Sequence, residues 1–85
     1  MLSTDTLFHA AAHAARNLMV KYEQQSIALN NQIDEIWEEL IAIPKSQRKG
    51  HPVQLKYIEL NNQLAEADRK ANEYRQAYKE AVTLY

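Results

Sequence analysis

Three side chains near the N-terminus have the types and the spacing of metal ligands. Asp5, His9 and His13 follow one another at intervals of four residues, so a helix would place them on one face. Two histidines at this spacing can share a metal ion, and a carboxylate one turn earlier can add a third ligand. The sequence therefore predicts a candidate metal site. The alternative is a set of polar residues at a helix end, because the glutamate of helical metalloprotease sites does not follow His9.

A second group of residues is basic. Lys45, Arg48 and Lys49 lie in the short segment 45–51, which predicts a contact with a phosphate group or an acidic protein surface. The alternative is electrostatic compensation, because acidic residues crowd positions 34–39, where the end of a helix disfavours negative charge. These basic residues have no interleaved aromatic residues, which makes nucleic acid the less favoured partner.

Other chemistry has no candidate residues in this sequence. No Ser/His/Asp group, no paired carboxylates and no glycine-rich phosphate loop can be identified, and cysteine is absent. The formal net charge of −1 provides no overall field for nucleic acid or anionic lipid. We therefore expect a protein that is not an enzyme and that uses no cofactor.

The elements that would position these residues are two long helices. Apolar or small residues recur at alternating gaps of four and three, which is typical of a coiled coil, and the only glycine lies between two prolines. We predict an all-α single domain over residues 1–85, an antiparallel coiled-coil hairpin with helices at about 4–43 and 52–85. The predicted seam residues are Phe8, Ala12, Ala15, Met19, Tyr22, Ser26, Leu29, Ile33, Ile36, Leu40 and Ile43, then Val53, Tyr57, Leu60, Leu64, Ala67, Ala71, Tyr74, Tyr78, Ala81 and Tyr85.

The two halves of the seam fit one another when the paired residue numbers sum to 93. This register opposes large side chains to small ones, as in Tyr22 with Ala71 and Tyr78 with Ala15. A shift by one heptad would instead oppose Tyr22 to Tyr78. The complementary volumes favour the first register.

Several apolar residues fall outside this seam. Val20, Ile27, Trp37 and Ile41 lie on one flank of the first helix, and Ile58 lies on the corresponding flank of the second. Scattered surface apolar residues are common, but a tryptophan beside isoleucines has the composition of an interface centre. We therefore predict that a protein partner covers this flank. The partner is a second copy, which would give a four-helix bundle, or a different protein.

The order of elements supports the same interpretation. A helix, a turn with Pro44 and Ser46, and a helix rich in leucine and tyrosine is similar in plan to small type III secretion needle subunits and their co-chaperones. We expect a non-enzymatic interaction module of the adaptor, co-chaperone or inhibitor type. A virus-encoded inhibitor of a bacterial defence complex would have the same small size and lack of catalytic groups.

Two further functions are compatible with this sequence. The first is a metal- or ligand-binding homo-oligomer that uses Asp5, His9 and His13. The second is a four-helix bundle that binds nucleic acid through basic side chains on an outer face. Those basic residues are Arg16, Lys21, Arg69 and Arg75.

The hydropathy of the sequence indicates where in the cell the protein is expected. No apolar run reaches the roughly 20 residues that span a bilayer, and the N-terminal stretch lacks the features of a signal peptide. We expect a soluble cytoplasmic protein without membrane contact.

Overall fold

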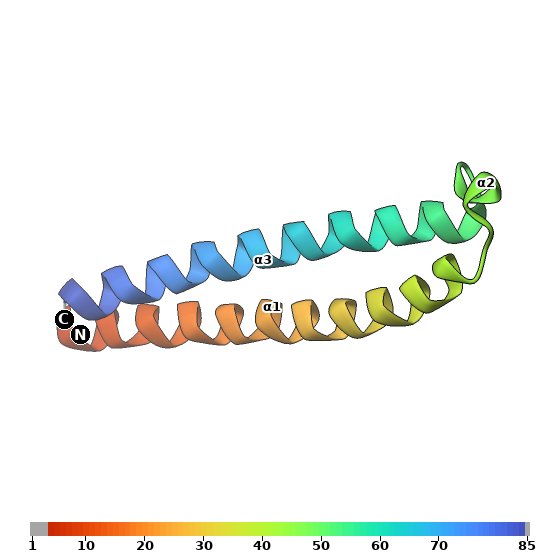
Figure 1. The fold of residues 1–85 in the computed structure, drawn as a ribbon. Helices are drawn as coiled ribbons and strands as arrows, with labels where there is room; N and C mark the ends of the chain where they lie inside the picture. The colour runs from red at the N-terminus through yellow and green to blue at the C-terminus, as the bar shows by residue number, and fades with distance from the viewer. Residues whose placement is uncertain (1–3, 85) are drawn as a thin grey trace.

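The structure is a long antiparallel helical hairpin. The computed structural model describes the backbone of residues 4–84 and the side chains of residues 9–83. Helix α1 (Thr4–Ile41) and helix α3 (Pro52–Leu84) lie side by side, and the short helix α2 (Lys45–Arg48) joins them at the end opposite the termini (Figure 1). The molecule measures 65 × 18 × 15 Å along its principal axes. The predicted fold class is confirmed.

The core follows the predicted seam. Ile33, Ile36 and Leu60 form a buried cluster near the turn, where burial of each side chain contributes about 1.5–3 kcal/mol. Towards the middle of the hairpin the buried residues become small, with Ala67 and Ala71 each only 4% exposed. Every buried side chain in the described part of the molecule is one of the predicted seam residues. They are Ala15, Ser26, Ile33, Ile36, Leu40, Leu60, Ala67 and Ala71.

Helix α1 ends two residues earlier than the sequence predicts. Pro44 disfavours helical geometry at Ile43 and has no N–H to donate to the Leu40 carbonyl. The Ile43 N–H donates to that carbonyl instead, over 3.1 Å, which tightens the last turn. The predicted turn also contains the short helix α2, which Pro44 precedes. The Pro44 carbonyl accepts a hydrogen bond from the Gln47 N–H over 2.8 Å.

Side chains at and just before the start of α3 hold this end of the helix. Gly50 adopts a φ of +74°, a conformation that costs glycine little, and its N–H donates to Gln54 Oε1 over 2.7 Å. The Val53 N–H donates to His51 Nδ1 over 3.1 Å, and Pro52 takes the first helical position, where a missing N–H removes no bond. The Val53 bond satisfies one of the donors at the helix start, and the Gly50 bond ties the preceding loop to the first turn of α3.

Candidate interaction face

One face of the hairpin carries nearly all of the exposed large apolar side chains. In the described part of the molecule seven such side chains are exposed, and six of them come one residue after a seam position. Because α1 and α3 run in opposite directions, the residue that follows a seam position points to the same side of the hairpin in both helices. We call this side the apolar face. Its members are Val20, Ile27, Trp37, Ile41, Ile58 and Val82.

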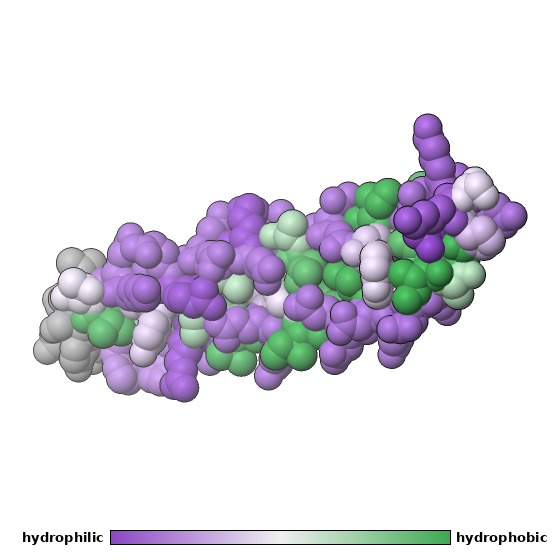
Figure 2. All heavy atoms as spheres, viewed as in Figure 1, coloured by the Kyte–Doolittle hydropathy of each residue, from purple (hydrophilic) through white to green (hydrophobic). Residues whose placement is uncertain are grey.

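The turn end of the apolar face is the most hydrophobic part. The Trp37 ring packs against the Tyr57 ring at a centroid distance of 5.6 Å, yet Trp37 remains 46% exposed. Ile41 and Ile58, at 44% and 49% exposed, also lie towards this end. Figure 2 shows hydrophobic side chains gathered towards the α2 end of the molecule, with a largely hydrophilic surface elsewhere in that view.

Sequence reasoning missed one member of this region. Leu55 is 57% exposed and precedes Ile58 by one helical turn, so the two side chains are surface neighbours. The signal was present in the sequence, because Leu55 comes two residues after the seam residue Val53 and therefore points away from the seam.

The centre of the apolar face is polar and contains two side-chain contacts between the helices. The Ser26 hydroxyl donates to Asp68 Oδ1 over 2.6 Å, from α1 to α3. Towards the termini, Arg75 Nη2 pairs with Glu23 Oε1 over 2.7 Å, also between the helices. The numbers of Ser26 and Asp68 sum to 94, close to the predicted register of 93. Glu23 and Arg75 sum to 98, and the long arginine side chain spans this offset.

The terminal end of the face contains the two predicted histidine ligands. Nε2 of His9 and Nε2 of His13 lie 3.0 Å apart, so one ring can donate a hydrogen bond to the other. The third predicted ligand, the Asp5 side chain, lies outside the described side chains. Among the described residues no group of three or more His, Cys, Asp or Glu side chains is arranged to hold a metal ion. Metal binding at Asp5, His9 and His13 therefore stays a prediction.

The two histidines also line a small hollow. It has a volume of about 200 Å³ and lies between the helices on the apolar face. The residues that line it are His9, Ala12, His13, Arg16, Tyr78 and Val82. Apolar and aromatic side chains therefore form one part of its lining, and histidine and arginine form the other.

The three basic residues of the turn differ in their surroundings. Lys45 and Lys49 are exposed, whereas Arg48 is half-buried. Arg48 Nε donates to the Ile43 carbonyl over 2.8 Å, and Nη2 donates to the Ile41 carbonyl over 3.1 Å. Arg48 thus satisfies carbonyls at the end of α1, as electrostatic compensation of this helix end predicts. Partner binding by Lys45, Arg48 and Lys49 stays a prediction.

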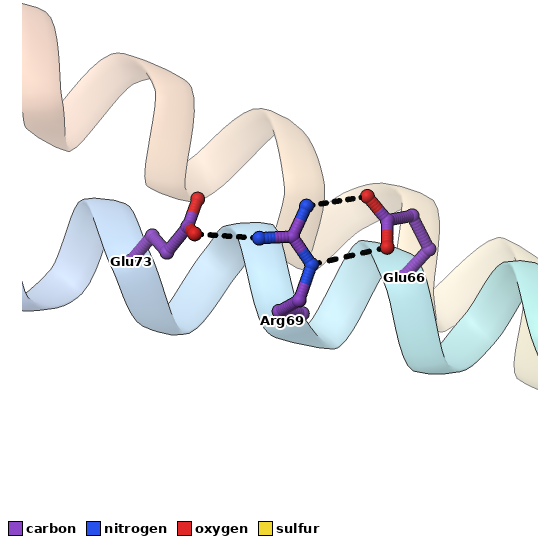
Figure 3. Close-up of polar contacts among 3 residues, drawn as sticks. All are labelled: Glu66, Arg69 and Glu73. Carbon is purple, nitrogen blue, oxygen red and sulfur yellow. Dashed lines mark hydrogen bonds and ion pairs between the residues drawn. The ribbon is translucent and has the colours of Figure 1, made fainter.

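Away from the apolar face, α3 carries an exposed ionic group. Arg69 bridges Glu66 and Glu73, with a two-pronged contact to Glu66 at 2.6 and 3.0 Å (Figure 3). The hydrogen bond from Arg69 lowers the pKa of Glu66 below its usual 4.5. The opposite side of the hairpin also has a wide groove, but most of its lining side chains are polar, including Gln25, Gln32 and Gln63.

Comparisons with protein families, with curated proteins and with solved structures give no significant match. Among the described residues, no helix has the length and apolar character needed to cross a membrane. The function has therefore to be argued from the surface of the hairpin itself.

Proposed function

We propose that this chain is a non-enzymatic protein–protein interaction module whose apolar face covers a surface of another protein chain. The observation that carries the proposal is the distribution of its exposed apolar side chains. Six of the seven large ones among the described residues share a single face. Random scatter over a two-helix surface would not concentrate them in this way. Trp37, Ile41 and Ile58 lie together at the turn end of this face, and exposed apolar patches mark interaction sites.

Trp37 is the expected centre of the interaction. Tryptophan is enriched among residues that dominate binding energy, and such residues lie in the middle of a patch that excludes water. Trp37 is supported from beneath by Tyr57 and flanked by the exposed Ile41 and Ile58. Its substitution should cost an interface at least about 2 kcal/mol.

The limited core of the hairpin supports the same proposal. Among the described residues no large side chain is completely buried, because two helices cover each other along only one stripe. A partner on the apolar face would add a second buried layer. Adaptors, co-chaperones and small inhibitors act by covering a surface of their partner. The proposal includes all three kinds of protein, and among the inhibitors those that viruses encode against bacterial defence complexes.

The test compares two substitutions on opposite faces. Trp37→Glu places a charge in the apolar face, whereas Ala28→Glu places one at an exposed position that lines the groove of the other face. The tagged full chain is purified from its own cells and its particle mass is measured. We expect a stoichiometric complex with another protein or a second copy for the wild type and Ala28→Glu, but not for Trp37→Glu. A wild-type chain that stays monomeric and alone, or a complex that survives Trp37→Glu, would contradict the proposal.

A further inference from the structure

We infer that the occupant of the apolar face is a second copy of this chain, stacked face to face with the two hairpins antiparallel. The inference rests on the proposed function and names its partner. Three features support it: the charges of the face, the match between Trp37 and the hollow at the terminal end, and the available area.

The charges on the apolar face are arranged unevenly along its length. Arg16, Arg75 and Lys79 each follow a seam position near the terminal end, so cations gather there. Asp34 follows a seam position on the turn side of the centre and is exposed. Glu23 is already paired with Arg75. Asp68 follows a seam position at the centre of the face. The face is therefore more positive towards the termini, and Asp34 is its acidic side chain on the turn side of the centre.

Two symmetric ways of stacking this face on itself differ in their electrostatics. With parallel hairpins, α1 would lie on the partner's α3 at the same level, and Arg16 would face the partner's Arg75 and Lys79. With antiparallel hairpins, α1 would lie on the partner's α1, and Arg16 would face the partner's Asp34. Like charges across an interface are strongly disfavoured. Both arrangements place Asp68 opposite an acidic residue, which is the partner's Glu23 in the parallel one and the partner's Asp68 in the antiparallel one. The contact of Arg16 therefore selects the antiparallel arrangement, in which Asp68 keeps its hydrogen bond from the Ser26 hydroxyl of its own chain.

The alignment that pairs these charges also brings complementary shapes together. Pairing Arg16 with the partner's Asp34 requires that α1 residues facing each other have numbers that sum to 50. Trp37 then faces the partner's His13, which lines the hollow of about 200 Å³ at the terminal end. The protruding indole, 46% exposed, would fill a hollow that contains Ala12, Tyr78 and Val82. One register therefore provides both the ion pair and a knob-in-hole contact.

The face is large enough for a stable dimer. The 65 Å by 18 Å extent of the molecule gives it a footprint on the order of 1,000 Å², comparable to the roughly 800 Å² per partner of standard interfaces. Both copies would use the same surface, as two-fold symmetry requires, and the product would be a four-helix bundle.

The first experiment is a charge exchange, read out as the dimer dissociation constant from sedimentation of the full chain. Arg16→Glu and Asp34→Arg should each raise this constant about tenfold, and the double variant should return to within about threefold of the wild type. Glu35→Arg is the matched control, because it changes the neighbouring acid without changing the face. Helix content by circular dichroism establishes that each variant is folded. An effect of Glu35→Arg equal to that of Asp34→Arg, or a double variant no better than the singles, would overturn the inference.

The second experiment fixes the orientation through disulfide formation, since the natural chain contains no cysteine. Val20→Cys mixed with Asn30→Cys should give a mixed disulfide dimer, because these positions sum to 50. Val20→Cys mixed with Asn72→Cys should not, because that pair reports the parallel arrangement. The reverse result, or a chain that is monomeric up to millimolar concentration, would overturn the inference. The wild-type chain could instead be monomeric by itself and bind a different protein, and the Trp37→Glu chain could fail to bind that protein. This result would support the proposed function and exclude a second copy as the partner.

Discussion

The Ser26 hydroxyl donates a 2.6 Å hydrogen bond to Asp68 across the seam, although the two residues differ greatly in exposure. Ser26 is 8% exposed, whereas Asp68 is in contact with solvent. The pair thus links a buried polar group on α1 to a hydrated carboxylate on α3. A buried hydroxyl depends on its partner far more than a solvated carboxylate does.

This asymmetry predicts unequal costs for removing the two partners. Asp68→Ala deprives the buried hydroxyl of this acceptor and should lower the free energy of unfolding by about 1–2 kcal/mol. Ser26→Ala leaves a carboxylate that water can solvate, so it should cost less. In the Ser26→Ala background, Asp68→Ala should cost almost nothing. Urea unfolding of the four chains measures these differences, and an equal cost of Asp68→Ala in both backgrounds would show that the bond does not contribute.

Arg48 should stabilise the hairpin from within the turn. Its guanidinium donates to the carbonyls of Ile43 and Ile41, which lie beyond the regular hydrogen-bond ladder of α1. Arg48→Ala should therefore lower the free energy of unfolding by about 1–2 kcal/mol. Lys49→Ala, which removes a neighbouring exposed charge, should change it by less than about 0.5 kcal/mol. Thermal unfolding of both variants measures the difference, and similar melting temperatures would refute the capping role.

Glu66 should make a pH-dependent contribution through Arg69. Because the hydrogen bond from Arg69 lowers the pKa of Glu66 below 4.5, the folded chain keeps this carboxylate charged to lower pH than the unfolded chain does. The resulting stabilisation is present above pH 4.5 and is lost as the pH falls below it. Arg69→Gln should raise the pKa of Glu66, observed by NMR titration of its side chain, whereas the distant Arg16→Gln should not. An unchanged titration of Glu66 in Arg69→Gln would contradict this coupling.

The heptad pattern predicted the seam because helix period and apolar spacing alone decide which residues face the partner helix. It placed even the small residues Ser26, Ala67 and Ala71 correctly in the buried stripe. The predicted flank residues Val20, Ile27, Trp37, Ile41 and Ile58 are exposed for the same reason. The spacing of apolar residues is a property of the sequence alone, so the buried stripe could be predicted without knowledge of the structure.

The turn could not be predicted in the same way. The position of Arg48 depends on how the backbone leaves α1 after Pro44 and then re-enters one helical turn in α2. Its bonds go to backbone carbonyls, whose directions are set by local dihedral angles and not by side-chain spacing. The sequence therefore left open a surface contact and compensation of the helix end, and the bonds of Arg48 to the Ile43 and Ile41 carbonyls are of the second kind.

The histidine pair gives a final prediction, on metal binding. His9 and His13 hold their Nε2 atoms 3.0 Å apart, about the separation of two nitrogens bound at ~2.1 Å to one ion at adjacent positions. Nickel or zinc at ten times its dissociation constant should add about 1.4 kcal/mol of stability and raise the melting temperature by at least about 5 °C. Binding requires deprotonated imidazoles, so the rise should disappear in acid.

His51 provides the matched control for this prediction. Its Nδ1 already accepts from the Val53 N–H at the start of α3, and asparagine can replace it in that role. His13→Asn should therefore abolish the metal-induced rise in melting temperature, and His51→Asn should leave it intact. A chelator should return the wild-type chain to its original melting temperature. An equal rise in wild type and His13→Asn would show that the ion binds elsewhere, and no rise in either would exclude the site.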